Sequence, residues 1–104
     1  MSLQEFIDNS MARYTELRRN IHQHPEVGLE EHRTSDIVAN LLENWGYAVT
    51  RGMAKTGVVG TLRVGDSDKV LGLRADMDAL PMQEHSGKKW QSTVEGKFHG
   101  CGHD

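Results

Sequence analysis

Apolar residues in the first 45 positions recur at spacings of three and four, the period of a helix with one face toward a core. The first stripe consists of Leu3, Phe6, Ile7, Met11, Tyr14, Leu17 and Ile21. It predicts a helix from about Leu3 to His22, which Pro25 ends because proline disfavours helical backbone in the preceding residue. The second stripe consists of Ile37, Val38, Leu41, Leu42 and Trp45. It predicts a helix from about Glu30 to Trp45, closed by Gly46.

Beyond Gly46 the helical period is replaced by short runs rich in valine and leucine. These runs are Tyr47 to Arg51, Val58 to Val64 and Val70 to Ala75, with glycines and polar turn residues between them. We predict three strands, the last two forming a hairpin. The segment from Asp76 to Asp104 has no period and is interrupted by glycines, which is typical of a loop. Two helices followed by strands and a loop predict an α/β layered fold.

Composition narrows the classes of function. The 104 residues fit one domain, and 37% hydrophobic with 26% charged residues is typical of a globular chain. A net charge of -3 without a basic stripe argues against a nucleic-acid partner. No apolar run approaches the ~20 residues that span a bilayer, and the acidic N-terminal segment does not resemble a signal peptide. We therefore expect a soluble, cytoplasmic protein.

The only cysteine, Cys101, lies two residues before His103, and Gly100 and Gly102 allow the backbone to turn sharply around it. Thiolate and imidazole are good ligands for zinc and related metals. A buried cysteine beside a surface histidine is the commoner explanation of an isolated pair, because two ligands do not make a site. A reactive thiol is a further alternative, although no second cysteine is present to resolve it.

Asp76 and Asp78 follow directly on the third predicted strand. Open α/β sheets place ligands and catalytic groups at the carboxyl ends of their strands, and alternation would put both carboxylates on the same side. Such a carboxylate can fix the orientation of a metal-bound histidine. The plain alternative is a pair of solvated acids at a strand end.

A polar cluster closes the first predicted helix and consists of Arg18, Arg19, His22, His24, Pro25 and Glu26. Basic groups at a helix C-terminus interact favourably with the helix dipole, so this cluster is interpreted as a helix stop rather than a metal site. Among the other histidines, only His99 is near enough to Cys101 to line the same site.

Three segments taken together resemble the amidohydrolases of the hippurate hydrolase and indole-acetyl-amino-acid hydrolase type, which belong with the aminoacylase and carboxypeptidase metalloenzymes. The segments are Arg18 to Glu26, Gly72 to Glu84 and His99 to Asp104, in the order and spacing of that family. The family usually has methionine where Phe98 stands and alanine where Gly100 stands. Both differences are small.

The resemblance implies hydrolysis of N-acyl amino acids, or related acylated and peptide substrates, by water activated on two divalent metal ions. Cys101 and His103 match metal ligands, and Asp78 matches the catalytic-site acid that orients a ligand. Asp76 stands where many relatives have a ligand histidine, and we do not count it as a ligand. The ions would be zinc, manganese, cobalt or nickel.

The resemblance also implies a domain assignment. Residues 1–104 correspond to the N-terminal portion of a zinc-peptidase-like, three-layer catalytic domain, incomplete in this chain. The smaller lid domain, through which many members dimerise, is absent from this chain. The glutamate that serves as general base and the later histidines would follow Asp104. The alternative from another class is a truncated, non-catalytic metal-binding or interaction module.

Overall fold

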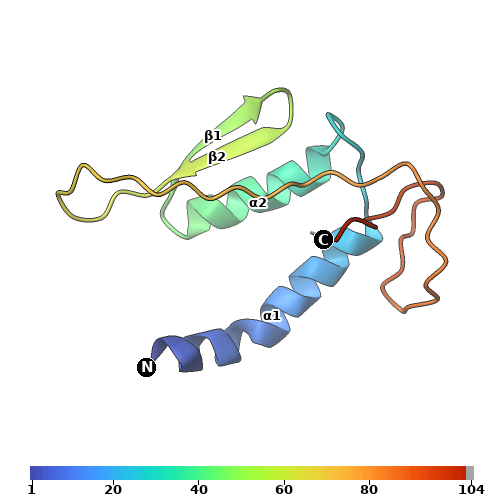
Figure 1. Ribbon diagram of the computed structural model, residues 1–104, viewed down its shortest axis with the longest axis horizontal. Coiled ribbons are helices and arrows are strands. Elements are labelled where there is room, and N and C mark those ends of the chain that lie inside the picture. The colour runs from blue at the N-terminus through green and yellow to red at the C-terminus, as the bar shows by residue number, and fades with distance from the viewer. Residues whose placement is uncertain (103–104) are drawn as a thin grey trace.

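The computed structural model describes residues 1–102. Their order is two helices followed by a two-stranded antiparallel sheet and a long segment without regular structure, as predicted for the start of the α/β layer. Helix α2 lies along the strand pair, and α1 runs away from both toward the N-terminus (Figure 1).

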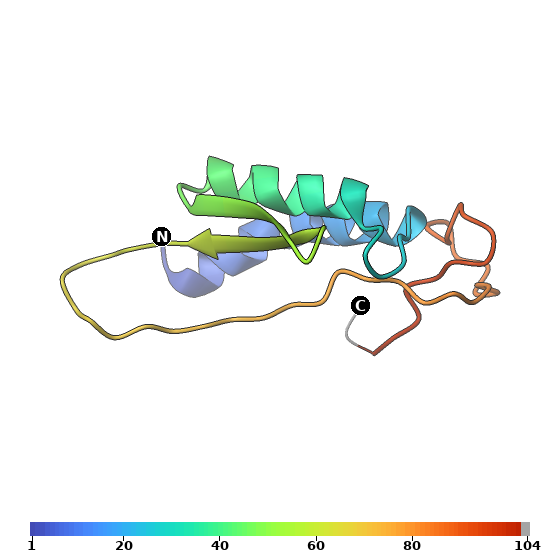
Figure 2. The same ribbon diagram turned by 90° about the horizontal axis from the view of Figure 1, so that it is seen from above.

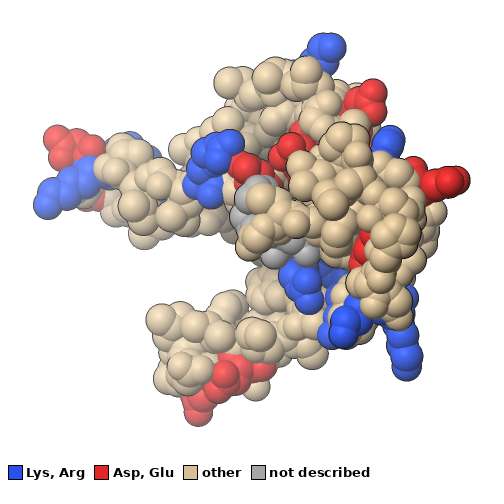
Figure 3. Space-filling view, turned by 45° about the vertical axis from the view of Figure 1, so that its right-hand side comes forward, with Lys and Arg blue, Asp and Glu red and all other residues tan. Residues whose placement is uncertain are grey.

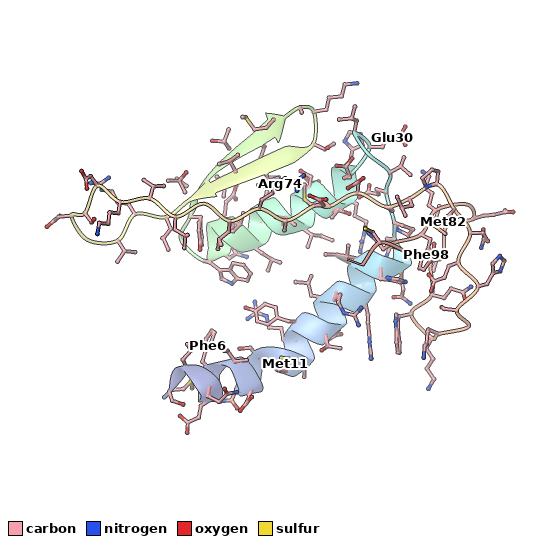
Figure 4. All side chains as sticks on the ribbon, in the orientation of Figure 1. Phe6, Met11, Glu30, Arg74, Met82 and Phe98 are labelled. Carbon is pink, nitrogen blue, oxygen red and sulfur yellow. The ribbon has the colours of Figure 1, made fainter. Side chains whose placement is uncertain are left out.

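Helix α1 spans Leu3–Gln23, as the apolar stripe predicted. A reciprocal cap fixes its start, because the Glu5 amide donates to Ser2 Oγ at 3.1 Å and the Ser2 amide donates to Glu5 Oε2 at 2.8 Å. Pro25 is buried just after its end. The first half of its apolar stripe is exposed, including Phe6 and Met11, which are labelled in Figure 4.

Helix α2 spans His32–Asn44, close to the predicted range. Its own N-cap residue, Glu31, makes no capping bond with its side chain. Glu26 caps the helix from outside: its carboxylate accepts from the Arg33 amide at 2.9 Å and from the Thr34 amide and hydroxyl at 2.7 Å each. The turn between the two helices is therefore fixed by one acidic side chain.

The strands are β1, Ala48–Met53, and β2, Gly57–Thr61. They pair antiparallel with Ala48 opposite Thr61, and the register shifts between Arg51 and Met53. A Cβ atom at Gly57 would lie 2.5 Å from the Met53 carbonyl oxygen, so this tight turn requires glycine. Gly60 likewise lets the Leu42 side chain of α2 approach the sheet.

The predicted third strand, Val70 to Ala75, and its hairpin with Val58 to Val64 are wrong. The partner of β2 is β1, and no backbone–backbone hydrogen bond joins residues 62–75 to another described residue. A strand needs a neighbour for its backbone groups, and here Val70 is 93% and Leu73 91% exposed. In Figure 2 this segment runs as a separate extended line below α2 and the strand pair.

The described core is small. Apart from Pro25, Ala39 and Ala79 are the only buried apolar residues within residues 1–102, whereas the buried polar residues are His22, Glu31, Thr34, Ser35, Thr56 and Glu84. In the same range, no helix has the length and apolar character needed to cross a membrane.

Glu26→Ala is expected to lower the free energy of unfolding by about 2 kcal/mol, because two amides and a hydroxyl at the start of α2 lose their acceptor. Urea denaturation followed by circular dichroism measures this change. Glu30→Ala is the matched control, since the exposed Glu30 carboxylate only approaches Lys97 at 3.9 Å. Equal losses in the two variants would contradict the capping role.

Candidate metal centre

The segment that carries Cys101 is held by two isolated backbone pairings. Ala79 pairs in parallel with Val27, and Leu80 pairs antiparallel with Phe98. The Ala79 amide donates to the Glu26 carbonyl at 2.8 Å, and the Leu80 and Phe98 amides donate to each other's carbonyls at 2.9 and 3.0 Å. The adjacent residues Ala79 and Leu80 thus join three stretches of backbone.

This pairing brings two predicted site segments together. In an antiparallel pair, residues before one partner lie beside residues after the other. Asp78 lies two residues before Leu80, and Gly100 lies two residues after Phe98. The loop of Cys101 therefore leaves the pairing on the same side as Asp78. The strand that was predicted to precede this acid is not formed.

A second set of contacts ties residues 84–93 to the end of α1. The Thr93 amide and hydroxyl donate to the Gln23 carbonyl at 2.9 and 2.7 Å. The Arg19 guanidinium lies over the Trp90 ring at 3.6 Å from its centroid, a cation–π contact. The loop is therefore fixed along α1 well before it reaches Cys101.

The third contact is a buried pair between His22 of α1 and Glu84 of the loop. His22 Nε2 lies 3.0 Å from Glu84 Oε1, and the two side chains are 8% and 2% exposed. Glu84 also accepts from the Ser92 amide at 2.9 Å and from the Ser86 hydroxyl. Burial alone would raise the pKa of Glu84, but the hydrogen bonds from Ser86, Ser92 and His22 hold it below its ordinary value of 4.5.

A cavity of about 730 Å³ opens beside these segments, between the helices, β2 and residues 71–78. Its lining includes the charged or polar residues Arg18, Asp76, Asp78 and His99, and the remainder is mainly apolar. Figure 3 shows a deep recess between the two projecting arms of the molecule, with both charge signs present on this face. The cavity brings the two predicted acids into one site with His99.

The predicted ligands are placed as follows. Cys101 is exposed and not in a disulfide. His103 lies outside the described residues, so its role as a ligand stays a prediction. Asp78 is exposed on the cavity wall, and Asp76 forms an ion pair with Arg74. Within residues 1–102, no three His, Cys, Asp or Glu side chains are close enough to hold one metal ion.

In the polar cluster at the end of α1, His24 has the structural role that was predicted. Its Nδ1 lies 2.8 Å from the Asn20 carbonyl oxygen of this helix. His22 differs, since it is buried against the loop. Its pairing with Glu84 was not predicted from the sequence. Both residues belong to the matched segments, Arg18 to Glu26 and Gly72 to Glu84, but nothing in either segment indicates contact across 62 positions.

Comparison with known proteins supports the resemblance. The profile of Peptidase family M20/M25/M40 matches residues 72–104. Hippurate hydrolase of Campylobacter jejuni is 45% identical over 104 residues, all of this chain and 27% of that protein. IAA-amino acid hydrolase ILR1-like 4 of Arabidopsis thaliana is 49% identical over 88 residues, 85% of this chain and 20% of that protein.

A solved structure supports the fold. The YXEP protein of Bacillus subtilis, described as a dinuclear metal binding peptidase from the M20 family, matches with a TM-score of 0.81 and 34% identity. The match covers 88% of this chain and 26% of the Bacillus chain. This chain thus spans about a quarter of the length of the relatives it matches.

The lowered pKa of Glu84 predicts acid sensitivity. Its carboxylate is favoured in the folded state, so its contribution is fully present above about pH 4.5 and is lost as the pH falls through the lower folded value. We expect wild type to be more stable than Glu84→Gln at pH 6, with a difference that shrinks below pH 4.5. Urea denaturation at pH 6, 5, 4 and 3 measures it. A difference that stays constant down to pH 3 would contradict this assignment.

Proposed function

Because this chain is a relative of the M20 metal-dependent amidohydrolases, we propose that the protein hydrolyses the amide bond of N-acyl amino acids. The observation that carries the proposal is the exposed, free Cys101 thiol, on a loop that the Leu80–Phe98 pairing directs to the side of Asp78. Two relatives are named for hippurate and for IAA-amino acids, which agrees with an acylated amino acid as the substrate class.

In this proposal Cys101 and His103 are metal ligands, and Asp78 orients one ligand. The described residues fit this role in donor chemistry, because an accessible thiol suits zinc and the Asp78 carboxylate lines the adjoining cavity. Manganese, cobalt and nickel are the other candidates. Two divalent ions would supply Lewis acidity and lower the pKa of a bound water from about 15.7 toward about 7.

The remaining assignments are proposals of the same kind. Residues 1–104 form the N-terminal portion of the catalytic domain, and the general base belongs to a segment outside these residues. The protein acts in the cytoplasm, where a single free thiol stays reduced, and it can form homo-oligomers through a lid domain. The alternative is a non-catalytic metal-binding or interaction module. Such a protein would have the ligand loop but no general base, so it would bind metal without hydrolysing substrate.

The deciding experiment is metal analysis and hippurate hydrolysis with the product of the complete reading frame. Cys101→Ser is expected to lower bound metal and the rate of hydrolysis at least about tenfold, since losing a direct ligand costs no less than losing a residue that orients one. Asp78→Asn should reduce both by about 10- to 100-fold.

Asp66→Asn serves as the control, because this exposed acid lies outside the cavity wall. It should leave metal content and rate unchanged. Unchanged values in Cys101→Ser would overturn the proposed centre. Metal binding without any hydrolysis by the wild type would favour the non-catalytic module.

A further inference from the structure

The buried contact between His22 and Glu84 links the end of α1 to the loop that leads to Cys101. Both carboxylate oxygens of Glu84 are engaged: Oε1 faces His22 Nε2 and the Ser92 amide, and Oε2 accepts from the Ser86 hydroxyl. One side chain thus fixes two points of the loop, which lie two and eight residues after Glu84, against the last turn of α1.

His22 continues the contact toward the candidate ligand. Its ring lies edge-on to Phe98, with centroids 5.6 Å apart and an interplanar angle of 81°, and its centroid is 6.2 Å from that of His99. Phe98 in turn leaves no space at Gly100, where a Cβ atom would lie 2.7 Å from two Phe98 ring carbons. Figure 4 shows Phe98 and Met82 beside each other at the end of α1. The packing therefore runs from Glu84 to the residue before Cys101.

We propose that His22 and Glu84 are positioning residues, which orient the Phe98–Cys101 backbone so that the Cys101 thiol faces the metal. The inference rests on the proposed metal role of Cys101. Neither residue touches the metal in this proposal. They act through Phe98 and Gly100.

A purely structural role explains these residues less well. Replacing both partners of a buried hydrogen-bonded pair by apolar groups of the same shape can be nearly neutral or stabilising, so such a pair is weak evidence for stability alone. His22 also packs against Phe98 and His99, which lie three and two residues before Cys101. A carboxylate with three donors has one favoured orientation, which an apolar contact would lack.

The test uses the product of the complete reading frame and follows the alkylation rate of Cys101, by mass spectrometry of its peptide, with increasing zinc. In the wild type, zinc is expected to protect the thiol. In His22→Phe, which keeps an aromatic ring beside Phe98 but loses the nitrogen facing Glu84, half-protection should need at least tenfold more zinc. Glu84→Gln should behave in the same way. The readings are taken at a temperature where each variant shows the helical signal of the wild type.

Glu31→Gln is the matched control, because it alters another buried carboxylate whose hydrogen-bond donors lie outside the loop. The Glu31 carboxylate accepts from the Thr56 hydroxyl at 3.1 Å. Its zinc requirement should equal that of the wild type. An equal shift in Glu31→Gln would show general destabilisation and overturn the positioning role. So would unchanged zinc requirements in both His22→Phe and Glu84→Gln.

If either variant loses the helical signal, Ser86→Ala takes its place, since it removes a single donor from Glu84. It should raise the zinc requirement about threefold, and no change would overturn the inference. A wild type that zinc does not protect at any concentration overturns the metal role of Cys101 itself. Failure of the proposed function is thus distinguished from failure of the positioning role.

Discussion

Three carboxylates, of which Glu31 and Glu84 are buried and Glu26 is half-buried, connect the segments of this chain to one another. Glu26 joins the turn after α1 to the start of α2, Glu31 joins that turn to Thr56 in the turn between β1 and β2, and Glu84 joins the loop to His22. The described core has little apolar volume, so directional hydrogen bonds to these acids determine how the segments sit. A carboxylate that accepts two or three hydrogen bonds favours one arrangement of the donors around it. The geometry of the candidate site therefore depends on polar contacts more than on apolar packing.

The two helices and the first two strands could be predicted from the sequence because their patterns are local. The stripe from Leu3 to Ile21 specifies α1, and Gly46, with a φ of 90°, ends α2 in the left-handed conformation expected of glycine. The run Val70 to Ala75 is as rich in valine and leucine as the observed strands but forms no strand. Strand pairing depends on a neighbour for the backbone, and that information does not reside in the run itself.

The same distinction applies to the site. Cys101 and Asp78 were predicted as site residues from their motifs, and the structure adds the Leu80–Phe98 pairing, from which both segments leave on the same side. The pairing of His22 with Glu84 could not be predicted, since a polar residue at a helix end and an acid in a loop have ordinary local explanations. Their contact spans 62 positions and arises only when residues 84–93 fold back along α1.

The position of Ala79 shows why the two halves of the centre are held to different degrees. Downstream of Ala79, the loop is fixed to Gln23, His22 and Arg19 before it reaches Cys101. Upstream, residues 62–75 share no backbone–backbone hydrogen bond with another described residue. The thiol therefore follows a loop that is fixed at several points, while Asp78 lies between the paired Ala79 and the unpaired segment, three residues after Ala75. In the proposed centre Asp78 orients a ligand and does not bind the metal itself. Metal binding would therefore order the upstream segment through this contact, because the metal stabilises the arrangement in which its ligands are correctly oriented.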